Sequence, residues 1–113
     1  MAQLPVACSL TSPELRQRRD QVLELLRHHC GEQRPLVNGY RLQFDGERDV
    51  IAALLTLIEL ERECCPFLTF QLAVEPDHGP VYFELTGPVG TREFLETELG
   101  LAGDALRRAP NTI

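Results

Sequence analysis

The sequence lacks the features that mark several common classes of protein. Its 113 residues carry a formal net charge of −6, whereas non-specific binding to nucleic acid or to anionic lipid requires a basic surface. No apolar run reaches the length of a membrane-spanning helix. Residues 1–8 contain no basic segment followed by an apolar one, so no secretory signal is predicted. We therefore expect a cytoplasmic protein that binds neither nucleic acid nor membrane.

Several chemical motifs are missing as well. The chain has no glycine-rich phosphate loop, no zinc-finger spacing, no nucleophile elbow and no helix-turn-helix pattern. A chain of this length, read as one domain over 1–113, can bury a core without disulfide or metal staples. Thiols stay reduced in the cytoplasm, where cysteines indicate metal binding, redox chemistry or a structural role. The four cysteines are Cys8, Cys30, Cys64 and Cys65.

The hydrophobic pattern predicts an α+β two-layer sandwich with the order β-α-β-α-β-β-α. We expect a small, mainly antiparallel sheet with helices on one face, and a last segment, 102–113, that frays. An open edge of the final hairpin also suggests a homodimer. Helices are predicted at about 12–29, 47–64 and 90–99, and strands at 3–10, 36–44, 67–74 and 80–86.

The end of the second predicted helix is the most informative part of the chain. Extending the apolar stripe of this helix by three- and four-residue steps reaches Glu61 and then Cys64 and Cys65. Pro66 disfavours helical geometry at the residue before it, so the helix is expected to end near Cys64. A carboxylate and two thiols therefore continue the buried face of the most apolar helix.

Adjacent thiols at this position favour binding of a soft metal ion. Thiolate ligands select Hg(II), Cu(I), As(III) or Zn(II) over hard ions. Cys8 is a candidate third ligand if its strand lies beside the strand that follows the two cysteines. Glu61 is a candidate proton acceptor or weak oxygen ligand, and Arg19 on the first helix is a candidate partner for it. Together, Glu61 and Arg19 would set the protonation of Cys64 and Cys65.

Two other interpretations stay open. A thiol-dependent redox or organometal-processing enzyme would use Cys64 or Cys65 as nucleophile, Glu61 as proton acceptor and Cys8 as resolving thiol. An interaction protein with inert cysteines would simply bury them, because free cysteine behaves as a small hydrophobe. The C-terminal end of a helix is the negative end of its dipole, which disfavours a thiolate there.

Motifs spread over nearly the whole chain resemble a group of short bacterial proteins. Residues 7–11 read A-C-S-L-T, residues 61–67 read E-R-E-C-C-P-F, and residues 86–88 read T-G-P. The chain is similar to largely uncharacterised proteins with a C-S-L-T start and an E-R-x-C-C-x-F centre. The resemblance implies an association with mercury and heavy-metal resistance. It also implies a soft-metal role for Cys8, Cys64 and Cys65. We therefore expect a sensor, scavenger or delivery protein that binds a soft metal ion, with Hg(II) preferred.

Overall fold

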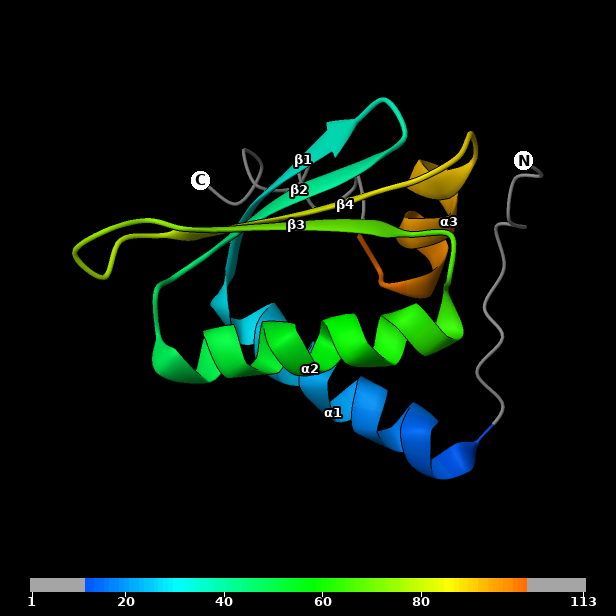
Figure 1. Ribbon diagram of the computed structural model, residues 1–113, viewed down its shortest axis with the longest axis horizontal. Coiled ribbons are helices and arrows are strands. Elements are labelled where there is room, and N and C mark those ends of the chain that lie inside the picture. The colour runs from blue at the N-terminus through cyan, green and yellow to red at the C-terminus, as the bar shows by residue number, and fades with distance from the viewer. Residues whose placement is uncertain (1–11, 102–113) are drawn as a thin grey trace, which may run out of the picture.

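The computed structural model describes residues 12–101 and confirms the predicted α+β class (Figure 1). The strand predicted at 3–10 and the tail predicted at 102–113 lie outside the described residues. Within the described part, three helices accompany one four-stranded sheet. The helices are α1 (Pro13–His29), α2 (Arg48–Cys64) and α3 (Thr91–Glu98). The strands are β1 (Cys30–Leu36), β2 (Gly39–Phe44), β3 (Thr69–Val74) and β4 (Val81–Thr86).

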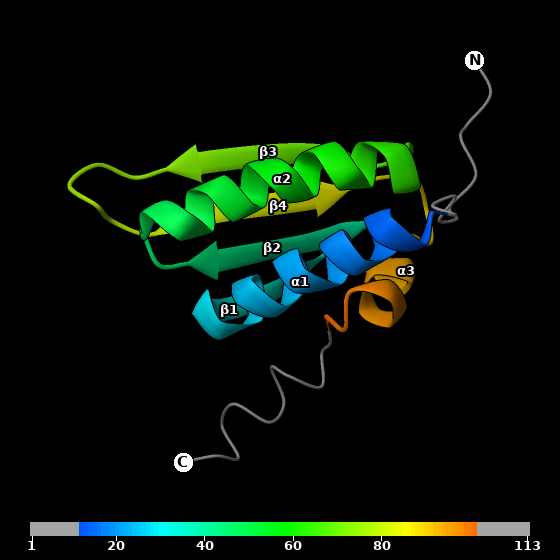
Figure 2. The same cartoon turned by 90° about the horizontal axis from the view of Figure 1, so that it is seen from below.

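The sheet has the strand order β1-β2-β4-β3, and every neighbouring pair is antiparallel. Helices α1 and α2 lie together on one face of the sheet, with α3 at one end of it (Figures 1 and 2). In the view of Figure 2, α2 crosses β3 and β4 while α1 crosses β2 and β1. No helix among residues 12–101 is long and apolar enough to cross a membrane. This arrangement leaves one buried layer, between the helices and the sheet.

The sequence prediction misses β1. The predicted end of the first helix near His29 is confirmed, but Cys30 and Gly31 do not form a glycine-terminated helix end, because Cys30 already has extended backbone angles and begins β1. The predicted strand 36–44 contains a turn, so that β1 and β2 form a tight hairpin. As an edge strand, β1 alternates poorly between buried and exposed positions. Strand β1 is therefore held in place by its backbone hydrogen bonds to β2 and not by burial of one face of its side chains.

Local signals predict the two long helices well. Ser12 caps α1, because its side-chain oxygen accepts a hydrogen bond from the backbone N–H of Leu15 at 3.4 Å, and Pro13 is the first helical residue. Helix α2 begins and ends where its apolar stripe does. The sequence pattern also predicts Leu55 on the buried side of this stripe, but its side chain is 53% exposed. The buried face of α2 consists of Val50, Ala53, Leu54, Leu57, Leu60, Glu61 and Cys64.

Candidate metal centre

The C-terminal end of α2 brings two cysteines and a carboxylate together. The backbone N–H of Cys65 donates to the carbonyl oxygen of Glu61 at 2.6 Å, and this bond closes the last turn of the helix. Cys65 itself has left helical geometry, with φ −130° and ψ 73°, as expected for a residue that precedes proline. Because Glu61 lies one turn upstream, its side chain shares a face with those of Cys64 and Cys65.

The three side chains form a compact and fully buried group. The sulfur of Cys65 lies 3.4 Å from the sulfur of Cys64 and 3.5 Å from Oε1 of Glu61. One ligand atom from each residue lies within 4.8 Å of the other two, and all three residues have 0% exposure. Cys65 is a free thiol, whereas Cys64 is joined in a disulfide bond, which differs from the reduced thiols expected from the sequence. A metal ion that uses both sulfurs therefore requires the reduced protein.

Arg19 of α1 reaches the same group from the neighbouring helix. Its Nε donates to Oε2 of Glu61, and its Nη2 lies 3.5 Å from Oε1. Burial lowers the pKa of Arg19, but the hydrogen bond and the negative charge of Glu61 outweigh this effect and raise the pKa above its ordinary value. The guanidinium therefore stays charged, and a buried carboxylate has a fixed cationic partner.

The thiol of Cys65 holds its proton strongly. Burial is the main cause, because it disfavours the charged thiolate, and the negative charge of Glu61 adds to the effect. Arg19 acts in the opposite direction, but the pKa of Cys65 still rises to about 12. At neutral pH this thiol is protonated, so it becomes a metal ligand only when an ion displaces its proton.

The structure thus brings together four of the five residues singled out from the sequence. Glu61, Cys64 and Cys65 form one group, Arg19 contacts this group through Glu61, and the pairing of Arg19 with Glu61 suggested by the sequence is present. Cys8 lies outside the described residues, so its approach to the other thiols stays a prediction. The other described cysteine, Cys30, begins β1 and is not part of this group.

Sequence reasoning missed one set of polar residues near Cys30. The side chains of Arg27, Cys30 and Gln33 line a common cavity with apolar residues from several elements. No spacing in the sequence marks this set, because its members come from α1 and from the unpredicted strand β1. What distinguishes this set is that a cysteine and a glutamine lie beside an otherwise apolar layer. Because that layer forms only when distant segments pack together, the sequence alone carries no signal for it.

No protein-family model matches the chain, and no curated protein or solved structure matches it either. Chemistry can therefore be assigned to this group only from the residues themselves and from their geometry.

Proposed function

We propose that the reduced protein binds one soft metal ion through Cys64 and Cys65, with Glu61 as an oxygen ligand or proton acceptor. The observation that carries the proposal is the buried group in which these three ligand atoms lie within 4.8 Å of one another. Soft thiolate ligands favour thiophilic ions over Mg²⁺ or Ca²⁺. The protein would act in the cytoplasm as a sensor, scavenger or delivery protein for that ion, with Cys8 as a further ligand.

Charge balance favours a divalent ion. Arg19 and Glu61 together carry no net charge, and two thiolates with one divalent ion add none. The same site would hold a net charge of −1 with Cu(I) and +1 with As(III). An uncompensated charge in a buried site is unfavourable by several kcal/mol or more. For a site with only these two thiolates, Hg(II), which the family resemblance favours, and Zn(II) are therefore the best candidates, whereas a third thiolate from Cys8 would balance the charge of As(III).

The spacing of the sulfurs argues for more than two ligands. Two sulfurs 3.4 Å apart that each lie about 2.3 Å from one ion would subtend roughly 95° at it. A linear two-coordinate site would require a sulfur separation of about 4.6 Å. A bent pair leaves room for a third ligand, which Glu61 offers from the same helix face. Cys8 is the other candidate for that position.

The surroundings of Cys65 favour a role as metal ligand over a role as catalytic nucleophile. A nucleophilic cysteine needs a lowered pKa and access to its substrate. Cys65 has neither, because its pKa is about 12 and its side chain is fully buried. A metal ion, in contrast, can displace the proton and needs only a narrow path to the sulfurs. The third interpretation, of an interaction protein with inert cysteines, is the outcome that remains if no ion binds.

The proposal is tested by metal titration of the protein reduced with a phosphine. Hg(II) and Zn(II) would be added separately, and thiolate-to-metal absorption in the ultraviolet would be followed. Bound metal would be counted by mass spectrometry after gel filtration. We expect one ion for each chain in the wild type, and loss of that ion in the double variant Cys64→Ser/Cys65→Ser. Circular dichroism would show whether this variant is folded.

The chain supplies a matched control for this experiment. Cys30→Ser also removes one thiol, but from a residue outside the buried group, so it should bind metal like the wild type. Cys8→Ser tests the proposed further ligand, for which we expect weaker binding rather than none. Equal metal uptake by the wild type and the folded double variant would overturn the proposed function.

A further inference from the structure

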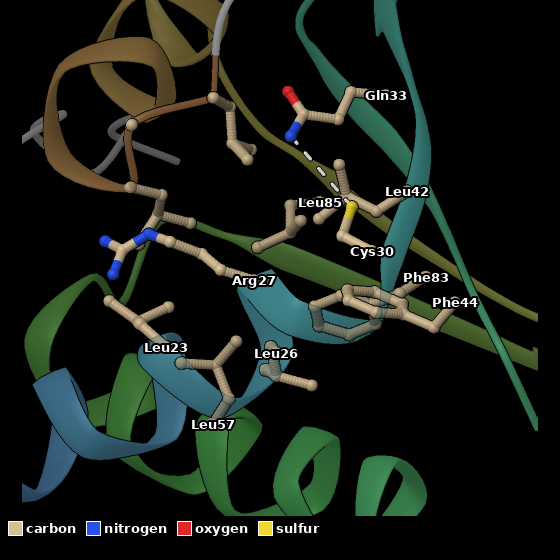
Figure 3. A pocket seen from close by; sticks show the side chains of 13 residues that line it. Leu23, Leu26, Arg27, Cys30, Gln33, Leu42, Phe44, Leu57, Phe83 and Leu85 are labelled. Carbon is tan, nitrogen blue, oxygen red and sulfur yellow. Dashed lines mark hydrogen bonds between the residues drawn. The ribbon is translucent and has the colours of Figure 1, made fainter. Parts of the chain in front are cut away.

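A cavity of about 280 Å³ lies between α1, the sheet and residues 99–101 (Figure 3). Its wall is mostly apolar, with leucine and phenylalanine side chains from α1, α2, β2 and β4. Leu26, Phe44, Phe83 and Leu101 are representative of these side chains. Glu61, Cys64 and Cys65 are not among the described residues that line this cavity. The cavity is therefore a separate feature of the molecule.

Three polar side chains interrupt this apolar wall. Figure 3 shows Gln33 and Cys30 side by side, with Arg27 extending from α1 on another side of the cavity. The side-chain nitrogen of Gln33 lies 3.9 Å from the sulfur of Cys30. Arg27 is the one charged side chain among the described residues that line the cavity. A guanidinium, a primary amide and a thiol all offer hydrogen-bond donors, so they favour a ligand whose polar end accepts hydrogen bonds.

We propose that this cavity binds a small apolar carboxylic acid. Its hydrocarbon part would pack among the leucine and phenylalanine side chains, and its carboxylate would meet Arg27 and Gln33. Binding sites for small molecules commonly combine an apolar wall with a few polar groups that fix orientation. A cavity of about 150 Å³ accommodates benzene. By proportion, one of about 280 Å³ accommodates roughly ten non-hydrogen atoms, which is the size of an eight-carbon acid.

The existing partner of Arg27 does not block this role. Its Nη1 lies 3.1 Å from Oε1 of Glu24, but both side chains are more than half exposed. Exposed pairs of this kind contribute little to stability. A guanidinium has five N–H donors, so Arg27 can donate hydrogen bonds to a ligand carboxylate while it still contacts Glu24. The ligand carboxylate can also replace Glu24 as the partner of Arg27. A carboxylate in a bidentate contact with arginine is among the stronger polar interactions in proteins.

The test is a calorimetric titration of the full chain at pH 7 with three ligands. Octanoate has the predicted size and charge, 1-octanol has the same tail without the charge, and butyrate has the same head with a short tail. We expect one octanoate molecule to bind to each chain, with a higher affinity than 1-octanol or butyrate. No binding of octanoate, or equal binding of octanol, would overturn the proposal.

Variants separate the two halves of the proposed site. Arg27→Gln should weaken octanoate by about tenfold or more and leave octanol unchanged. Arg18→Gln, an exposed arginine on the same helix that does not line the cavity, should leave both unchanged. Cys30→Phe should fill part of the cavity and weaken both ligands. Octanoate binding that Arg27→Gln leaves unchanged would overturn the proposed contact between Arg27 and the ligand carboxylate.

A measurement on the wild type guards against a variant that fails to fold. Methyl resonances of Leu26, Leu42 and Leu101, which line the cavity, should shift on addition of octanoate. Methyl resonances of Leu55, which is exposed on α2, should not shift. Shifts confined to residues away from the cavity would overturn the assignment of the site.

Discussion

Arg19 and Glu61 form a buried ion pair that joins α1 to α2 beside the thiol of Cys65. Nε of Arg19 contacts Oε2 of Glu61, and the thiol lies 3.5 Å from Oε1. One carboxylate therefore contacts a cation from the neighbouring helix and a sulfur from its own. Each member of this group sets the charge that the others experience, and this arrangement has measurable consequences.

Removing one member of the ion pair should destabilise the protein strongly. Glu61→Gln leaves the Arg19 guanidinium, 8% exposed, without its anionic partner. We expect a loss of about 3–5 kcal/mol in the free energy of unfolding, measured by urea denaturation. The double variant Arg19→Met/Glu61→Leu removes both charges and should recover most of this loss. Arg18→Met, on the exposed face of α1, should change stability by less than about 0.5 kcal/mol. A small effect of Glu61→Gln would contradict the prediction.

Stability should fall at high pH because of Cys65. Its pKa is about 12 in the folded protein, against an ordinary value of 9.0. Between these values the folded protein keeps a thiol proton that the unfolded chain has lost, so rising pH favours unfolding. The expected slope reaches about 1.4 kcal/mol for each pH unit. Urea unfolding of the wild type and of Cys65→Ser at pH 8, 9 and 10 measures this contribution, because serine does not titrate in that range. Parallel pH profiles of the two proteins would refute it.

Metal affinity should rise steeply with pH. A metal ion must displace the proton of Cys65, whose pKa lies far above neutrality. Each thiol proton released makes the apparent association constant rise about tenfold for each pH unit. Competition with a chelator of known affinity at pH 6, 7 and 8 would measure the slope, after correction for the chelator's own protonation. A pH-independent affinity would show that the ion does not use this sulfur.

Substitution of Gly39 should disturb the sheet. A Cβ at this position would lie 1.9 Å from the backbone oxygen of Leu85, where β2 pairs with β4. Gly39→Ala forces the two strands apart, and we expect a cost of about 1–3 kcal/mol or more in the free energy of unfolding. Gly31→Ala is the matched control, because its Cβ would make an ordinary contact of 3.5 Å with Gln43. Equal thermal stabilities of the two variants would contradict this account.

The parts of the structure that sequence reasoning predicts are those determined by local chemistry. Ser12 and Pro13 mark the start of α1, and the helical spacing of Glu61, Cys64 and Cys65 places them on one face. These signals lie within a few residues of the feature that they specify. The α+β class follows from the alternation of helical and strand patterns along the chain.

The missed features depend on contacts between distant segments. Strand β1 is stabilised by its pairing with β2, so its own sequence carries little alternation. The helical spacing places Cys65 on the buried face of α2, and the helix dipole already disfavours a thiolate there, but the size of the rise in the pKa of Cys65 depends on how the folded chain packs around it. The cavity beside Cys30 requires α1, β1 and residues 99–101 to converge. Such convergence is a property of the fold and not of any one segment.

The Arg19–Glu61 pair would connect the proposed ion site to a second helix. The two residues lie on different helices, so a bound ion that drew Glu61 toward the sulfurs would also weaken its contact with α1. Binding of an ion by two sulfur atoms would then change the strength with which α1 packs against the rest of the protein. The outer face of α1 is exposed to solvent and therefore accessible to another molecule. Such coupling would convert occupancy of a closed site into a change of shape at the surface.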